Sequence, residues 1–181
     1  MSTATHSTRP RTRRSEAIGF IPCPTPHGDM LAAFSDQGLC RLLAPGMTPG
    51  ELERWTDRHA PGAYLHPLDD TPHGLDAQLT AYFDGDGRAF DLPLDLRGTP
   101  FQTAVWEAVL AIPYGETRSY IDIARTVGRP DAPRAVGAAN AINPLAVVVP
   151  CHRVVGADGS LKGYVGGILN RRMLLQLEGV V

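Results

Sequence analysis

Lysine and cysteine are both scarce in this 181-residue chain. Lys162 is the single lysine beside sixteen arginines, and Cys23, Cys40 and Cys151 are the three cysteines. An odd number of cysteines at such wide spacing does not fit a disulfide framework and is typical of a reducing compartment, so we expect a cytoplasmic protein. No two cysteines lie two to four residues apart, and Cys23 and Cys40 with His27 would supply only part of a zinc ligand set. We therefore predict no metal site.

Long apolar runs are also missing. None approaches the ~18 residues that a membrane-spanning helix needs, so we expect no membrane association. Residues 1–15 contain four arginines but no apolar core of the kind a secretory signal requires, and we predict a disordered basic tail there. Residues 1–97 carry nine arginines against thirteen acidic residues, whereas residues 98–181 carry eight basic residues against six acidic ones. The second part is therefore the better candidate for binding a polyanion.

The first part of the chain alternates short apolar runs with turn residues. Residues 17–22 and 30–34 predict a hairpin, and residues 38–46 a third strand. Thr48 followed by Pro49 predicts the start of a helix that reaches residue 60, and a second helix is expected over residues 75–85. Residues 88–98 are typical of an edge strand or an extended connector. We predict an α/β domain over residues 16–92 and a linker over 93–98, with no catalytic constellation in either.

The second part, residues 99–181, begins with strong helix signals. Thr99, Pro100 and Gln102 form a capping-box pattern, with an apolar stripe behind it. Thr117 is the expected cap of a second helix that stops at Gly128. A short turn and a helix of small residues over 134–143 follow, and this pattern fits either a helix-turn-helix or two short helices that simply pack together. Residues 145–150 predict a buried strand, residues 156–164 a turn or hairpin, and residues 168–179 a closing helix.

The stretch "PCHRVV" places Cys151 directly before His152 and Arg153. A reactive cysteine needs a base or a cationic neighbour, because the thiolate is the nucleophile. Neighbouring residues on a strand point to opposite faces, however, so adjacency is not contact. On the pair alone, a buried structural thiol, a metal ligand and a nucleophile all remain open. Glu178 is the one acidic residue near the end of the chain that could orient the histidine.

The longer strings "IPYGETRSYIDIA" and "RAVGAANAINPLAVVVPCHRVVGADGSLKGYVGG", with the closing "LLQLEG", resemble the O6-alkylguanine-DNA alkyltransferase family over residues 99–180. The resemblance implies an α/β (α+β) fold: a small N-terminal lobe like ribonuclease H, and a mainly helical C-terminal lobe with a helix-turn-helix of the winged-helix type. It also implies DNA repair by stoichiometric, irreversible transfer of an alkyl group from O6 of guanine to the protein's own cysteine, with O4-alkylthymine left open.

The resemblance also implies a role for individual residues. Cys151 resembles the acceptor, His152 the base that deprotonates it through a water, and Glu178 the carboxylate that orients His152. Asn143 is similar to the asparagine that ties the active-site loop to the helix-turn-helix, and Tyr120 to the tyrosine that donates toward the departing guanine. The residues implied in base flipping are Arg134, as the wedge that replaces the flipped base, with Ala135, Gly137 and Ala138. Those implied in the substrate pocket are Tyr120, Val154, Tyr164, Val165 and Gly166.

The implied partner is double-stranded DNA carrying O6-alkylguanine, with no cofactor. We expect a monomer, and cooperative assembly on DNA stays open. The alternative is a regulatory or lesion-binding module that uses the same pocket without transfer, but such relatives replace the cysteine that this chain retains. A cysteine hydrolase is a third hypothesis, for which the sequence shows no oxyanion-hole signal.

Overall fold

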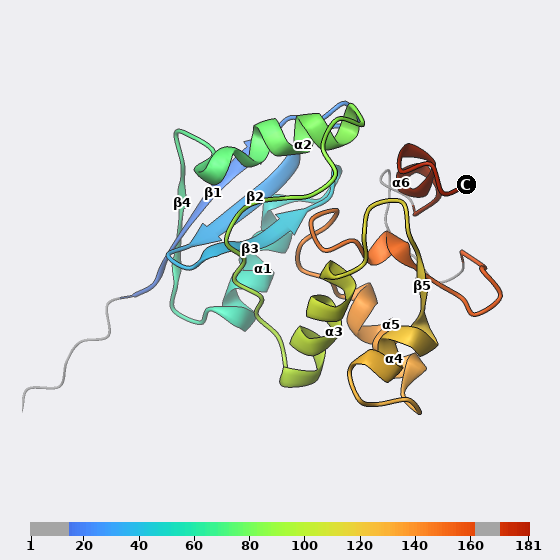
Figure 1. The fold of residues 1–181 in the computed structure, drawn as a ribbon. Helices are drawn as coiled ribbons and strands as arrows, with labels where there is room; N and C mark the ends of the chain where they lie inside the picture. The colour runs from blue at the N-terminus through green and yellow to red at the C-terminus, as the bar shows by residue number, and fades with distance from the viewer. Residues whose placement is uncertain (1–14, 162–170) are drawn as a thin grey trace, which may run out of the picture.

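A computed structural model describes residues 15–161 and 171–181, which form two packed parts (Figure 1). The first contains the four-stranded sheet of β1 (Ala17–Cys23), β2 (Met30–Ser35), β3 (Gly38–Leu43) and β4 (Tyr64–Pro67), in the order β3-β2-β1-β4. The hairpin and the third strand are confirmed as antiparallel neighbours. The sequence did not predict β4, which pairs in parallel with β1.

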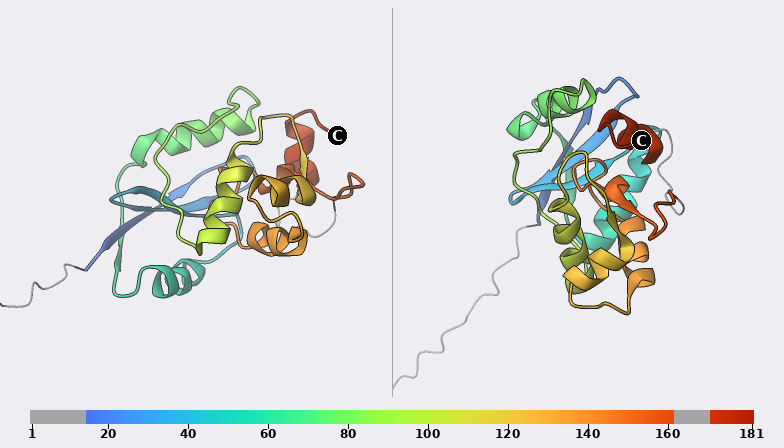
Figure 2. Two further views of the ribbon diagram at one scale, coloured as in Figure 1. Left: turned by 60° about the horizontal axis from the view of Figure 1, so that its bottom comes forward. Right: turned by 45° about the vertical axis from the view of Figure 1, so that its right-hand side comes forward.

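Two helices cover opposite faces of this sheet, as Figure 2 shows. α1 (Pro49–His59) begins at the predicted cap, where Thr48 and Glu51 form a capping box, and packs on one face through Leu52 and Trp55. α2 (Leu75–Phe83) follows a short 3₁₀ turn, η1 (Pro72–Gly74), and buries its apolar residues on the other face. Both predicted helices are confirmed.

The segment that leads from α2 to the second part is an extended connector. It touches the sheet at one bridge, where Leu94 lies beside Leu39 of edge strand β3. Gly38 permits this approach, because a Cβ at that position would lie 2.2 Å from the carbonyl oxygen of Pro93. β3 also receives residues from beyond the connector, since its Leu42 bridges to Leu145. The edge of the sheet is thus covered by the second part of the chain.

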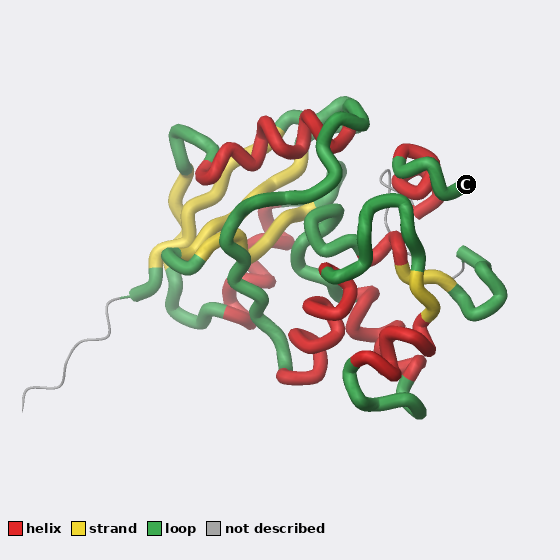
Figure 3. The backbone as a smooth tube through the Cα atoms, in the orientation of Figure 1, coloured by secondary structure: helices red, strands yellow, loops and turns green. Residues whose placement is uncertain are grey.

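The second part is mainly helical (Figure 3). Its elements are α3 (Pro100–Leu110), β5 (Arg118–Ser119), α4 (Tyr120–Thr126), α5 (Pro133–Ala141), η2 (Cys151–Arg153), β6 (Val154–Val155) and α6 (Arg171–Leu177). α3 packs against α4 and α5, which are joined by a short turn. The capping box of Thr99 and Gln102 is confirmed.

The predicted cap of α4 was wrong. Ser119, not Thr117, is its N-cap: the Ser119 hydroxyl accepts from the backbone N–H of Asp122, and the Asp122 carboxylate accepts from the backbone N–H of Ser119. Thr117 lies ahead of the two-residue strand β5, which pairs with β6. The helix begins only after β5, because the backbone groups of Arg118 and Ser119 pair with β6.

The predicted strand over residues 145–150 was also wrong. After the single bridge at Leu145 the chain coils into a tight turn, in which the N–H of Val149 donates to Leu145 O. Val147 has φ +70°, in the left-handed region that β-branched residues avoid. The apolar run is buried in the core, as predicted, but burial does not require a strand.

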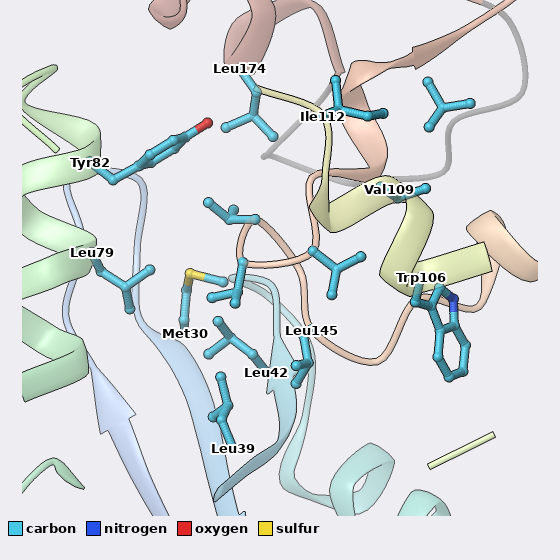
Figure 4. Packing of buried hydrophobic residues seen from close by; sticks show 14 of the residues in the cluster. Met30, Leu39, Leu42, Leu79, Tyr82, Trp106, Val109, Ile112, Leu145 and Leu174 are labelled. Atoms are coloured by element: carbon cyan, nitrogen blue, oxygen red, sulfur yellow. The ribbon is translucent and has the colours of Figure 1, made fainter. Parts of the chain in front are cut away.

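One large apolar cluster joins the two parts. Figure 4 shows Met30, Leu39 and Leu42 of the sheet and Leu79 of α2 facing side chains of the second part. Trp106, Val109, Leu145 and Leu174 come from that side and are all buried. The sheet and the helical part are therefore held together by a shared core. Within the described ranges, none of the helices is long and apolar enough to cross a membrane.

Candidate active site

Cys151 opens the 3₁₀ turn η2, directly after Pro150. Its side chain is 4% exposed, and its backbone N–H donates to Val149 O at 2.7 Å. A 3₁₀ turn rotates by about 120° per residue, so Cys151 and His152 point in different directions. Whether a water links them stays a prediction.

The other two cysteines lack the setting of a nucleophile. Burial, with the charge of Asp76 adding to it, raises the pKa of Cys23 to about 11. Burial raises the pKa of Cys40 to about 12, and its thiol donates to Ala33 O. Both thiols stay protonated at neutral pH. Among the three cysteines, only Cys151 is followed directly by a histidine.

His152 is fully buried, and its Nε2 lies 2.7 Å from Oε1 of Glu178. An ionised carboxylate only accepts hydrogen bonds, so Nε2 carries the proton and Nδ1 keeps a lone pair. Nδ1 has no hydrogen-bond partner within the described ranges. Burial lowers the pKa of His152, the hydrogen bond and charge of Glu178 oppose this, and the positive charges of Arg153 and Arg171 add to the lowering. The imidazole is therefore a neutral base near pH 7.

Glu178 follows α6 directly and is the centre of a buried network. Its Oε2 accepts from Nε of Arg153 at 2.8 Å and from the N–H of Gly115 at 3.2 Å. Its Oε1 accepts from Nη2 of Arg153 at 2.9 Å and from the hydroxyl of Tyr82 at 2.7 Å. Burial by itself raises the pKa of Glu178, but the hydrogen bonds from His152, Arg153 and Tyr82 outweigh it and lower the pKa to about 2. Glu178 is thus a fixed negative charge behind His152.

Two asparagines shape the turn that carries Cys151. Asn143 donates through Nδ2 to Val149 O at 2.8 Å and accepts the N–H of Leu145 on Oδ1 at 2.9 Å. Asn140, at the end of α5, donates to the carbonyl of Cys151 at 3.2 Å. Asn140 therefore connects α5 to the backbone of Cys151, and Asn143 holds the turn that precedes it. The role of Asn143 in the reaction stays a prediction.

Tyr120 begins α4 and is held by a cation. Its hydroxyl accepts from Nη2 of Arg171, a buried residue of α6, at 2.9 Å. Because a hydroxyl can accept and donate at once, the Tyr120 proton is still available to a substrate atom. A nearby positive charge also makes the hydroxyl a stronger donor.

The exposed face of α5 consists of one long side chain and small ones. Arg134 lies in the first turn and is exposed, as are Ala135 and Ala138. Gly137 faces Tyr120, whose ring would lie 3.7 Å from an added Cβ. The opposite face buries Val136, Ala139 and Asn140. The exposed face, with its small side chains, lets a partner surface approach the backbone of α5.

The predicted substrate pocket is only partly visible. Val154 is fully buried and belongs to the core cluster. Tyr164, Val165 and Gly166 lie outside the described residues. A groove of about 680 Å³ between α1 and residues 140–147 reaches Cys151, but neither Tyr120 nor Val154 lines it.

Three members of the site were not singled out from the sequence: Tyr82, Asn140 and Arg171. Arg171 and Asn140 lie in the predicted helices over residues 168–179 and 134–143, but nothing in their spacing marked them. Tyr82 lies in the predicted helix over residues 75–85, where its spacing did not distinguish it either. Within residues 15–161 and 171–181, no group of three or more His, Cys, Asp or Glu side chains could hold a metal ion.

Comparison with known proteins identifies relatives of this chain. Residues 100–180 match the family model described as 6-O-methylguanine DNA methyltransferase, DNA binding domain. The chain is 57% identical over 152 residues to the methylated-DNA–protein-cysteine methyltransferase of Mycobacterium tuberculosis, covering 84% of this chain and 82% of that protein. The inducible methylated-DNA–protein-cysteine methyltransferase of Bacillus subtilis is 46% identical over 128 residues, covering 71% of this chain and 72% of that protein.

Solved structures agree as well. The crystal structure of Mycobacterium tuberculosis OGT in complex with DNA is similar with a TM-score of 0.74 and 44% identity, covering 90% of this chain and 92% of that one. The O6-methylguanine-DNA methyltransferase of Pyrococcus kodakaraensis is similar with a TM-score of 0.59 and 26% identity, covering 90% and 99% of the two chains. The mixed α+β fold, the sequence identity and the coverage together show that this chain belongs to the methylated-DNA–protein-cysteine methyltransferase family.

Proposed function

We propose that this protein repairs DNA by moving the alkyl group of O6-alkylguanine onto Sγ of Cys151, once per molecule. Sγ attacks the alkyl carbon, the bond between that carbon and O6 breaks, and its electron pair stays with the guanine. The thiol proton passes to Nδ1 of His152 through a water. The product is a thioether, which the described groups of the site, His152, Glu178 and Tyr120, do not cleave, so the reaction ends there.

The observation that carries the proposal is the orientation of His152. Glu178 binds Nε2 and leaves Nδ1 unprotonated, so the residue that follows Cys151 in the chain has a nitrogen able to accept a proton. Glu178 is itself held by Arg153 and cannot take up the proton at neutral pH. The fixed negative charge then stabilises the imidazolium that forms.

Tyr120 and Arg171 supply the second half of the chemistry. Charge develops on the guanine as its bond to the alkyl carbon breaks. The Tyr120 hydroxyl, which already accepts a hydrogen bond from Arg171, donates a hydrogen bond to the guanine and so stabilises that charge.

DNA binding fits the helix-turn-helix of α4 and α5. A guanine inside a base stack cannot meet the thiolate, so it must be turned out at a cost of a few kcal/mol. Arg134 is exposed at the start of α5 and can fill the space that the base leaves. The first turn of α5 has no side-chain cap, so its N–H groups can bind a phosphate.

We also infer that the lobe that contains α4 and α5 is of the winged-helix type, with β5 and β6 as its short sheet. Residues 16–92 then form a ribonuclease-H-like domain and residues 99–181 the acceptor domain.

Transfer of labelled methyl from duplex DNA containing O6-methylguanine tests the proposal. One equivalent of label should reach the protein, and mass spectrometry should find it on Cys151. Cys151→Ala should bind the DNA without accepting label, whereas the matched control Cys40→Ala should accept one equivalent. Binding without transfer by the unmodified protein would favour a lesion-binding module, and more than one equivalent would contradict the single-use reaction.

A further inference from the structure

Tyr82 places a hydroxyl from the sheet lobe inside the network of the acceptor lobe. It lies near the end of α2 and is 1% exposed. Its hydroxyl lies 2.7 Å from Oε1 of Glu178 and 3.3 Å from Nε2 of His152. Figure 4 shows the ring reaching from α2 toward α6, with its oxygen at the far end.

We infer that Tyr82 is a positioning residue of the transfer reaction, through which the sheet lobe sets how readily His152 takes the proton of Cys151. The inference rests on the relay of the proposed function. It adds a specific role for a lobe in which the sequence predicted no catalytic constellation.

The hydrogen bonds leave Tyr82 one arrangement. Glu178 is ionised, so the Tyr82 hydroxyl must donate to Oε1. The hydroxyl oxygen then faces the N–H of His152 with its lone pairs, at 3.3 Å. Both contacts favour the tautomer with the proton on Nε2, which is the one that leaves Nδ1 ready to accept. Burial and the charge of Glu178 raise the pKa of Tyr82 far above its usual value, so the hydroxyl stays protonated throughout the working range.

Tyr82 also moderates the charge that His152 feels. Oε1 of Glu178 accepts from Tyr82, His152 and Arg153, and each donor weakens the attraction that the others feel. Among the residues that the structure describes, the other charged or titratable groups that act on Tyr82 or His152 are Arg171 of α6, which lowers the pKa of His152, and Tyr114 after α3. Tyr114 faces Tyr82 and Arg153 with its ring, while its hydroxyl donates to Leu177 O at 3.0 Å.

Removing the Tyr82 hydroxyl should therefore have a directional effect. Oε1 would be left to His152 and Arg153, so its charge would act more strongly on the N–H of His152. The imidazolium would be stabilised, and His152 would be protonated, and so unable to act as a base, up to a higher pH. The ring would also lose a fixed partner on its Nε2 side.

The test compares Tyr82→Phe with Tyr114→Phe, which removes a tyrosine hydroxyl from the same cluster without touching the carboxylate. The single-turnover rate constant for transfer from free O6-benzylguanine is measured between pH 5 and 9, so that DNA binding does not enter. For Tyr82→Phe we expect the acid limb of the pH–rate profile to move up by about one pH unit. At a pH on that limb, the rate constant should then be about tenfold lower. The limb of Tyr114→Phe should coincide with that of the unmodified protein.

A Tyr82→Phe profile that superimposes on the unmodified one overturns the inference, and so does an equal shift in Tyr114→Phe. A second measurement does not depend on the folding of a variant. In the unmodified protein labelled with ¹⁵N-histidine, the His152 signal, assigned by its loss in His152→Gln, should show a protonated Nε2 and an unprotonated Nδ1 at pH 7. The opposite tautomer overturns the inference. An unmodified protein that transfers no alkyl group contradicts the proposed function instead, and the tautomer still tests the hydrogen-bond arrangement on which the inference rests.

Discussion

Replacing Glu178 by glutamine should destabilise the protein strongly at neutral pH and much less in acid. The two carboxylate oxygens accept hydrogen bonds from Arg153, His152, Tyr82 and Gly115, all of them donors. In either orientation of a glutamine amide, its NH₂ group would face donors in place of acceptors, so hydrogen bonds on that side would be lost. It also leaves the guanidinium of Arg153, 7% exposed, without its counter-charge.

The magnitude follows from the pKa of Glu178, which folding lowers from 4.5 to about 2. A depression of that size corresponds to roughly 3 kcal/mol of stability from the ionised carboxylate. Loss of one partner of a buried ion pair gives a similar figure, ~3–5 kcal/mol. Because the folded pKa is the lower one, this stability is complete above pH 4.5 and is lost as the pH falls toward 2. At pH 3 the difference between the two proteins should therefore have fallen to about 1 kcal/mol.

Urea unfolding at several pH values between 7 and 3 measures this difference directly. Glu116→Gln is the matched control, since Glu116 pairs with Arg118 at the surface, with side chains 49% and 45% exposed. Such a pair contributes ~0–1 kcal/mol, so the control should stay close to the unmodified protein. A Glu178→Gln difference that is the same at pH 7 and pH 3, or that is below 1 kcal/mol at pH 7, would refute the reasoning.

Three further predictions concern DNA, the reacted protein and the turn before Cys151. Arg134→Ala should slow transfer from duplex DNA more than transfer from free O6-benzylguanine, because only the duplex requires base extrusion; equal losses would contradict the wedge role. Methylation of Cys151, a packed thiol, should lower stability by ~1–3 kcal/mol, seen as a lower melting temperature, and an unchanged one would count against overpacking. Asn143→Ala should cost ~1–3 kcal/mol in urea unfolding, because Leu145 N–H and Val149 O lose their partner; an unchanged midpoint would exclude that role.

Local signals in the sequence were sufficient for most helices. The caps at Thr48 and Thr99 and the stop at Gly128 involve residues within four positions of one another, and the structure has them as predicted. Local signals misled at Thr117, where pairing of β5 with a distant segment postpones the helix to Ser119. They misled again at residues 145–150, where apolar β-branched residues suit a strand but Asn143 and the edge of β3 fix a turn.

Cys151 and His152 could be identified from the sequence because they lie in a distinctive string, and resemblance to a family added Glu178. The contacts of Glu178 could not be predicted. Tyr82 is 96 residues away along the chain and reaches Glu178 only because α2 packs against the shared core. Neither hydrophobic spacing nor local charge distinguishes such a tyrosine from one that is merely buried.

The sequence by itself determined the chemistry available to this protein: one cysteine in a motif with a base, a helix-turn-helix with small residues, and helices with defined ends. These depend on interactions between near neighbours, which a linear pattern records. The tertiary structure decided which nitrogen of His152 is left without a proton and which groups hold Glu178 ionised. Those properties depend on burial and on hydrogen bonds between α2, η2 and α6, which only folding brings together.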